Sequence, residues 1–340
     1  MNILFSCAGR RNYLLQYFKN ALAGKGEVFA TDLSPLAPAM AEADKSFLVP
    51  SVDADNYLTS LLQICQDNEV SIVISLNDHE LPILAAAKDR FLAIGTTVVI
   101  SDLSVIELCF DKSLTESFAE KIGIKTPLTF TSLESAIQAI EANILSFPLF
   151  VKPRWGSGSA GIERVESLQE LNLAWEFNNI KLDRWGLRIG TEKESGLLIQ
   201  QALPGCEYGV DIINDLNGNY QATFVKQKLG MRAGETDKAK TVNLPIFEDI
   251  GKKISIALGH IGNLDCDFFV DGNEIYLLEM NPRFGGGYPF SAEAGVDVPA
   301  ALIAWVAGVQ PHSSWKNIKF NVTTAKCDRL VKVSEIYLNT

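Results

Sequence analysis

Apolar and polar positions alternate over the first hundred residues in the rhythm of strands followed by helices. Short apolar runs predict strands at Ile3–Ser6, Glu27–Ala30, Ser71–Ser75 and Thr97–Ser101. Apolar side chains at helical spacing predict helices at Asn12–Leu22, Asp55–Asn68 and Glu80–Phe91. Strands that alternate with helices are typical of βαβ units, so we expect a parallel sheet in residues 1–110.

Polar residues follow three of these strands, at the strand ends where parallel sheets bind ligands. They are Gly9-Arg10-Arg11, Asp32, and Asp78 with Glu80. The first segment has only one glycine, so the G-x-G-x-x-G fingerprint of dinucleotide binding is absent. Its arginines and helix N–H groups are candidates for holding a carboxylate or a phosphate. The alternative is a tight turn with solvated arginines. Asp32 is a candidate for binding a ribose or an amine, and the roles of Asp78 and Glu80 stay open.

Residues 111–200 have a different pattern. A helix is predicted to begin after Asp111, a suitable N-cap, and to run to Gly123. A second helix is predicted at Leu133–Ala142, and strands at Pro148–Pro153 and Gly161–Val165 enclose a loop rich in glycine and serine. Helices beside a small antiparallel sheet indicate a separate α+β lobe.

Residues 201–340 are mostly β-structure with late helices. After a strand at Leu197–Gln200, antiparallel partners are predicted at Tyr208–Ile213 and Gly218–Lys228, and a helix at Ile246–Leu258. A hairpin joins Cys266–Val270 to Ile275–Met280 through the turn Asp271-Gly272-Asn273. We therefore expect three units, with residues 1–110, 111–200 and 201–340.

The hairpin carries candidate metal ligands. Glu279 and Asn281 are two residues apart on one strand, so their side chains share a face. Asp267 on the partner strand would complete a set of oxygen ligands suited to Mg²⁺, with Mn²⁺ as an alternative. A two-residue turn at Asp271-Gly272 would place Glu279 on the face opposite Asp267. The metal hypothesis therefore requires a loop with an odd number of residues or a β-bulge.

The segment after these ligands reads Asn281-Pro282-Arg283, followed by Phe284 and the run Gly285-Gly286-Gly287. Proline ends the strand ladder, and three consecutive glycines cost backbone entropy unless another group must approach closely. Together with the carboxylates, the segment favours phosphoryl transfer, with Arg283 stabilising the charge of the transferred group. The alternative is a solvent-facing edge strand.

Several lysines are candidates for contact with phosphate. Lys152 ends an apolar strand before a loop with Gly156, Ser157 and Gly158, whose N–H and hydroxyl donors can fold over phosphates. Lys112 in the first turn of its helix is unfavourable for the helix dipole, which indicates a second role. Lys228 and Lys238 lie in a basic stretch further along, where solvated charges are the default interpretation.

Composition narrows the classes of partner. The 340 residues carry a formal net charge of −11, which argues against nucleic acid. No apolar run reaches membrane-spanning length, and the first residues lack the basic stretch of a secretory leader. The six cysteines are widely spaced without a CxxC pair, which is typical of a reducing compartment, so a cytoplasmic location is expected.

Four motifs in order resemble those of the ATP-grasp superfamily, over essentially the whole chain. They are Phe110-Asp111-Lys112; Phe150-Val151-Lys152-Pro153 with its glycine loop; Gln200-Gln201-Ala202-Leu203 followed by Glu207; and Asp267 with Glu279-Met280-Asn281-Pro282-Arg283. The chain looks most like single-module proteins similar to half of a carbamoyl-phosphate synthase large subunit, and the ligase of pyrrolysine biosynthesis looks related. The resemblance implies an α/β fold with an N-terminal parallel-sheet domain, an α+β lid lobe and an antiparallel-sheet catalytic lobe.

The resemblance also implies cofactors and residue roles. ATP and one or two Mg²⁺ ions would bind, with Lys112, Lys152 and the loop of Gly156, Ser157 and Gly158 at the phosphates. The backbone of Gln201–Leu203 would contact adenine, and Glu207 the ribose. Asp267, Glu279 and Asn281 would hold the metal, and Arg283 would stabilise the acyl phosphate. Lys228 and Lys238 fall where relatives contact the γ-phosphate or the acceptor, and Asp267 stands where relatives often have Glu or Gln.

The leading functional expectation is a carboxylate–amine ligase that joins small molecules through an acyl phosphate. A carbamoyl-phosphate-type activity on bicarbonate or carbamate and a non-catalytic ATP-binding subunit are the alternatives. The identities of the acid and the amine stay open. The apolar stretch Ala300–Val309 is expected either in the core or at a homodimer interface.

Overall fold

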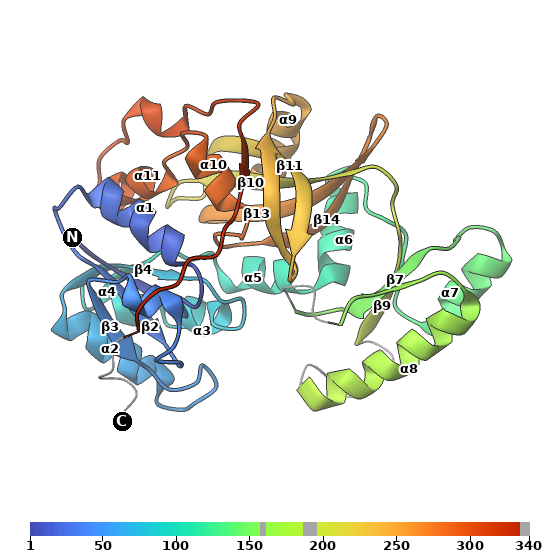
Figure 1. Ribbon diagram of the computed structural model, residues 1–340, viewed down its shortest axis with the longest axis horizontal. Helices are drawn as coiled ribbons and strands as arrows, with labels where there is room; N and C mark the ends of the chain where they lie inside the picture. Colours follow the sequence, from blue (N-terminus) through green and yellow to red (C-terminus); the bar gives the residue numbers. More distant parts are fainter. Residues whose placement is uncertain (157–160, 186–195, 334–340) are drawn as a thin grey trace.

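The structure is a computed structural model that describes residues 1–156, 161–185 and 196–333. These residues form a five-stranded, a four-stranded and a six-stranded sheet. Figure 1 shows the five-stranded sheet at the lower left, the six-stranded sheet at the upper centre, and β7 and β9 with α7 and α8 at the right. The expected order, a parallel-sheet unit followed by two antiparallel sheets, is confirmed.

The five-stranded sheet is parallel throughout, in the order β3 (Lys45–Leu48), β2 (Val28–Asp32), β1 (Asn2–Ser6), β4 (Val70–Ser75), β5 (Thr97–Val98). Its central strands are buried on both faces, which explains their continuous apolar sequence. Helices α1 (Asn12–Leu22) and α2 (Tyr57–Asp67) connect the strands, as predicted. The single helix predicted at Glu80–Phe91 is wrong: α3 (Leu81–Ala86) and α4 (Lys88–Leu92) are separated at Ala87, where ψ is 5°.

The four-stranded sheet has the order β6 (Thr129–Phe130), β9 (Leu197–Gln201), β7 (Leu149–Pro153), β8 (Glu163–Val165). Helices α7 (Leu133–Glu141) and α8 (Leu168–Trp185) pack against it. The sequence pattern did not predict α8, because the buried Asn178 interrupts the apolar stripe of Leu171, Trp175 and Leu182.

The six-stranded sheet is antiparallel, in the order β14 (Glu274–Asn281), β13 (Gly262–Asp271), β10 (Cys206–Asn214), β11 (Tyr220–Arg232), β12 (Glu235–Thr241), β15 (Thr323–Ala325). Helix α9 (Ile246–Leu258) covers its apolar face, and α5 (Leu103–Phe110) and α6 (Lys112–Lys121) pack on β14. Asp111 caps α6 as predicted, by accepting a hydrogen bond from the Ser113 amide (2.9 Å). The other face of this sheet is free to carry polar groups.

An apolar core joins the first unit to the last helices of the chain. The ring of Phe18 on α1 lies 6.0 Å from that of Phe284, and Tyr17 lies 6.2 Å from Tyr288 of α10 (Tyr288–Glu293). Helix α11 (Val298–Val306) packs against α1 with Leu302 fully buried, so the start of the late apolar stretch lies in the core, whereas Ala307–Val309 are exposed. These contacts fix the carboxyl ends of β1 and β4 beside the end of β14. Within the described residues, no helix has both the length and the apolar character needed to cross a membrane.

Candidate active site

A β-bulge in the hairpin of β13 and β14 brings the candidate metal ligands to one face. The turn holds two residues, Gly272 and Asn273, so a regular ladder would place Glu279 and Asp267 on opposite faces. The register shifts at Leu278, and Asp267 then pairs directly with Glu279. The condition set by the sequence, an odd loop or a bulge, is therefore met by the bulge.

The position of the bulge follows from packing. Leu277 and Met280 are three residues apart, yet both are buried in the apolar core, each 1% exposed. A regular strand would send residues three apart to opposite faces. Burying both side chains thus favours one extra residue between them, and that residue sets Glu279 and Asn281 on the polar face.

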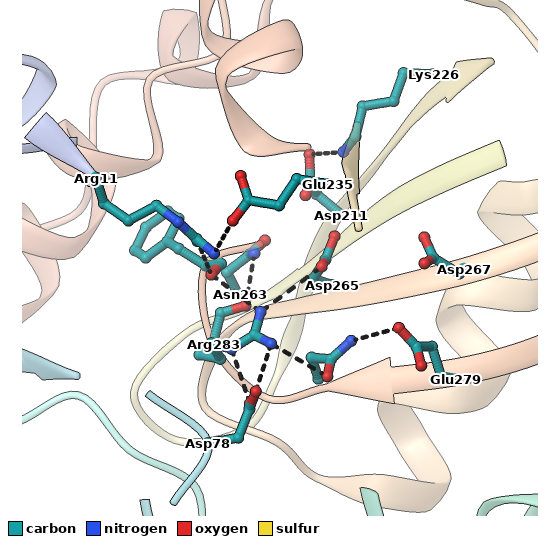
Figure 2. Close-up of polar contacts among 12 residues, drawn as sticks. Arg11, Asp78, Asp211, Lys226, Glu235, Asn263, Asp265, Asp267, Glu279 and Arg283 are labelled. Atoms are coloured by element: carbon teal, nitrogen blue, oxygen red, sulfur yellow. Dashed lines mark hydrogen bonds and ion pairs between the residues drawn. The ribbon is translucent and has the colours of Figure 1, made fainter. Parts of the chain in front are cut away.

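Ionisable side chains cover this polar face across four neighbouring strands. Gly209 on β10 pairs with Lys226 on one side and Asp267 on the other, and Asp211 pairs with Asp265. The polar face carries Glu207, Asp211, Lys226, Lys228, Asp265, Asp267, Glu279 and Asn281. Several of these converge from different strands in Figure 2. The face forms the floor of two cavities.

The first cavity has a volume of about 360 Å³ and lies between the four-stranded and six-stranded sheets. The predicted residues that line it are Lys112, Lys152, Gly156, Gln201, Leu203, Glu207, Asp267 and Glu279. Phe150, Trp155, Ile162 and Leu278 give it apolar walls. Apolar walls beside lysines and carboxylates suit a nucleotide with its base, phosphates and metal. We call it the nucleotide cavity.

The buried Lys152 and the half-buried Lys112 contact neutral groups in this cavity. The Lys152 ammonium donates to Oε1 of Gln200 (2.6 Å), and that of Lys112 to the carbonyl oxygen of Gly156 (2.8 Å). Burial lowers the pKa of both lysines, and the charge of Lys112 helps to lower that of Lys152 to about 8. Neither ammonium forms an ion pair with a residue in the described parts of the chain. This uncompensated charge favours an anionic ligand such as a phosphate.

Lys228 lies between two predicted ligands. Its ammonium is 2.6 Å from Oε1 of Glu207 and 2.7 Å from Oδ1 of Asp267. Burial alone would lower the pKa of Lys228, but the two carboxylates raise it well above its usual range. The sequence did not foresee this link between Lys228 and Glu207, which ties the ribose candidate to the metal candidate.

The oxygen donors fit a metal ion that arrives with a nucleotide. Within the described ranges, no group of three His, Cys, Asp or Glu side chains is arranged to hold a metal alone. Mg²⁺ needs only one or two carboxylates when phosphates supply further oxygens. Burial raises the pKa of Asp267 and neighbouring Glu279 adds to this rise, although Lys228 opposes it. This part of the polar face is therefore short of positive charge.

Arg283 is held by the first unit of the chain. Its Nε and Nη2 atoms donate to the two carboxylate oxygens of Asp78 at 2.8 and 2.7 Å. This bidentate ion pair is drawn in Figure 2. Nη2 also lies 3.3 Å from Oδ1 of Asn281. Asp78, whose role the sequence left open, therefore orients the guanidinium beside the metal candidates.

A second cavity of about 410 Å³ lies between the polar face and the carboxyl ends of β1 and β4. The turn Cys7–Arg11, Asp78, Glu235, Asp265 and Arg283 contribute to its lining, and we call it the acceptor cavity. Asp267 and Glu279 line both cavities, so they mark the boundary between them.

The arginine turn is shaped by carboxylates. Arg11 forms an ion pair with Glu235 (2.8 Å), whereas Arg10 is exposed and lies 3.7 Å from Asp328. Asp32 accepts a hydrogen bond from the Gly9 amide (2.9 Å), which supports the turn. Glu80 is fully buried and accepts hydrogen bonds from Ser6, Ser75 and Tyr57, which tie the neighbouring strand ends together.

The run of three glycines lets the backbone approach buried charges. A Cβ on Gly285 would lie 1.9 Å from Oδ2 of Asp265, and one on Gly287 would lie 2.7 Å from Cε of Lys226. Lys226 itself is fully buried in an ion pair with Asp211 (2.5 Å). The close approach expected from the sequence is therefore present.

The structure brings most predicted residues together, with exceptions. Lys238 is exposed on β12 beside Gly230 and lines neither cavity. Ser157 and Gly158 lie outside the described residues. Sequence reasoning missed Asp265, although the spacing of Asp265 and Asp267 repeats that of Glu279 and Asn281 on the partner strand.

Two family models match the chain. Residues 3–99 match the one described as the PylC-like, N-terminal domain, and residues 193–327 match "ATP-grasp in the biosynthetic pathway with Ter operon". The carbamoyl phosphate synthase large chain of Campylobacter jejuni is 27% identical over 226 residues, 63% of this chain and 20% of that protein. The D-alanine–D-alanine ligase of Streptococcus uberis is 30% identical over 205 residues, 56% of each chain. The chain therefore spans less than two thirds of either relative.

A solved structure shares the fold. Biotin carboxylase from Campylobacter jejuni, described as a complex with β,γ-ATP, superposes with a TM-score of 0.73 at 17% identity, covering 95% of this chain and 74% of that one. The chain therefore matches an ATP-grasp family model over residues 193–327 and shares its fold with this solved structure over 95% of its length. Its α/β architecture is the one expected from the sequence.

Proposed function

We propose that the chain is an ATP- and Mg²⁺-dependent carboxylate–amine ligase that forms an amide or peptide-like bond and releases ADP. One observation carries the proposal: Asp267 and Glu279, paired across the bulge, line both the nucleotide cavity and the acceptor cavity. ATP in the first cavity would present its γ-phosphate at that boundary, where a carboxylate in the second can reach it.

The lining of the nucleotide cavity supports residue roles. Lys112 and Lys152 bind phosphate oxygens, the backbone of Gln201–Leu203 contacts adenine, and Glu207 binds the ribose. Asp267 and Glu279, with Asn281 from the adjoining acceptor cavity, hold Mg²⁺, which Mn²⁺ can replace. The metal, when bound, screens the negative charge of the phosphates from the attacking carboxylate.

The chemistry needs alignment rather than a protein nucleophile. A substrate carboxylate oxygen bonds to the γ-phosphorus while the bond to ADP breaks, which leaves an acyl phosphate. The nitrogen of a neutral amine then bonds to the acyl carbon, phosphate leaves, and the amine loses a proton. Arg283, fixed by Asp78, stabilises the charge that develops on the transferred group. Lys228 beside Asp267 is available to the same phosphate.

The test measures ADP release with pooled amino acids, with and without bicarbonate. The ligase function predicts ADP formation that depends on the amino acids and not on bicarbonate. Stimulation by bicarbonate alone would favour the carbamoyl-phosphate-type alternative. Nucleotide binding without turnover under all conditions would favour a non-catalytic ATP-binding subunit. We also propose a cytoplasmic location, which the six free cysteines support.

A further inference from the structure

We propose that Asp265 binds the protonated amino group of a substrate, so that the acceptor cavity takes an amine-bearing molecule such as an amino acid. The proposal rests on the ligase function and extends it, because it assigns a substrate class and a residue to this cavity. It distinguishes an amino-acid substrate from bicarbonate, which has no amino group.

Asp265 has unused hydrogen-bonding capacity. The residue is 9% exposed and lines the acceptor cavity. Its nearest cation is Nη1 of Arg283 at 3.8 Å, too long for a hydrogen bond. Across the described ranges, no donor forms a hydrogen bond with this carboxylate. A carboxylate accepts several hydrogen bonds, so a buried one without donors is costly unless a ligand supplies them.

The surrounding cations are already engaged. Figure 2 shows Asp265 between the pair of Arg283 with Asp78 and the pair of Lys226 with Asp211. Each pair is closed by short contacts, at 2.7 and 2.8 Å for Arg283 and 2.5 Å for Lys226. Neither cation can turn to Asp265 without leaving its own buried carboxylate unpaired, which is strongly unfavourable.

The backbone of Gly285 covers one side of Asp265. Gly285 lies so close that a Cβ there would meet Oδ2 at 1.9 Å and Oδ1 at 2.4 Å. Asp265 also lines the acceptor cavity, together with Gly209 and Gly286, which lack side chains. The carboxylate therefore has a side covered by backbone and a side that faces the cavity.

An ammonium group fits this position better than a divalent metal or an anion. A divalent ion at Asp265 would lie close to the Arg283 guanidinium and be repelled by it, with little water to screen the charges. A phosphate or a substrate carboxylate would be repelled by Asp265 itself. An ammonium carries one positive charge and three donors, which satisfies a carboxylate through directional hydrogen bonds.

The decisive variant is Asp265→Asn, which keeps the shape and removes the charge. The matched control is Asp271→Asn, an exposed position near the end of the same strand. We expect Asp265→Asn to raise the KM for pooled amino acids by about 10- to 100-fold, the range of a charge-assisted hydrogen bond. Its affinity for a fluorescent ATP analogue with Mg²⁺ should equal that of wild type. The control should match wild type in both measurements.

Hydroxylamine distinguishes whether Asp265 binds the amino group of the attacking amine or that of the activated acid. It reacts with an acyl phosphate to give a hydroxamate and replaces the natural amine. If Asp265 holds the amine that attacks, its carboxylate takes up the ammonium proton and leaves a neutral amine that bonds to the acyl carbon. Asp265→Asn then still forms hydroxamates from the amino-acid pool but loses ligation. If Asp265 holds the amino group of the activated acid, both products fall together. Either result supports the proposal.

Three results separate the possible failures. An unchanged KM in Asp265→Asn, or a loss of Mg²⁺–ATP affinity as large as the change in KM, would overturn the amine site. A wild-type protein that forms neither hydroxamate nor amino-acid-dependent ADP would instead reject the ligase function. In that event the amine site is judged by thermal stabilisation with the amino-acid pool and Mg²⁺–ADP. Stabilisation of wild type but not of Asp265→Asn supports it, and equal or absent stabilisation rejects it.

Discussion

Raising the pH should weaken nucleotide binding through Lys152. This lysine is 8% exposed, and burial with the nearby charge of Lys112 lowers its pKa to about 8. Because the pKa is lowered, the ammonium loses its charge as the pH rises through this value. About three quarters of the molecules carry the charge at pH 7.5 and about 3% at pH 9.5, from the ordinary titration of one group. If ATP binds the charged form, its apparent dissociation constant should rise ~25-fold over that interval.

The assay is a fluorescence titration with an ATP analogue and Mg²⁺ between pH 7.5 and 9.5. The control is Lys152→Arg, since a guanidinium keeps its charge over this range. Burial lowers the pKa of Lys112 as well, so the control should retain a shallower slope rather than none. A flat profile in wild type, or equal slopes in both proteins, would refute the role given to Lys152.

Four further substitutions test the contacts around the polar face. Gly285→Ala should destabilise the fold by about 1–3 kcal/mol in urea unfolding, because its Cβ would meet a carboxylate at 1.9 Å. Gly286→Ala, with 3.1 Å to a flexible side chain, should cost less, and equal losses would contradict the argument. Lys226→Met should cost about 3–5 kcal/mol by leaving a buried carboxylate unpaired, and a neutral effect would be contrary evidence. Asp78→Asn should lower kcat more than it raises the KM for ATP, since it frees Arg283 and leaves the nucleotide cavity intact; an increase in KM alone would contradict this.

The hairpin shows which parts of the site could be predicted from the sequence. The two-residue period of a strand predicted that Glu279 and Asn281 share a face, and the need for a bulge or odd loop followed from counting. The place of the bulge depends on burying Leu277 and Met280 together against α5 and α6, a tertiary requirement that local sequence does not express. Without that register, the side on which Asp265 lies could not be assigned.

Ion pairs between residues far apart in the sequence could not be predicted, for a different reason. Asp78 and Arg283 are 205 positions apart and meet only because the aromatic core around α1 docks the two units. Lys238 lies outside both cavities on β12, a strand that was not predicted from the sequence, so its alternation could not be counted. The ladder of β11 and β12 also changes register between Lys228 and Gly230. Counting alternate residues from Lys228 therefore does not tell which side Lys238 occupies.

The central claim is that a substrate carboxylate attacks the γ-phosphate of ATP at the boundary marked by Asp267 and Glu279. The most direct measurement follows oxygen from substrate to phosphate, using amino acids labelled with ¹⁸O in their carboxyl groups. The account predicts a single ¹⁸O atom in each phosphate released with ADP, because the attacking oxygen leaves with the phosphate. Unlabelled phosphate formed together with ADP would mean that water or another group accepts the phosphoryl, and would contradict carboxylate activation.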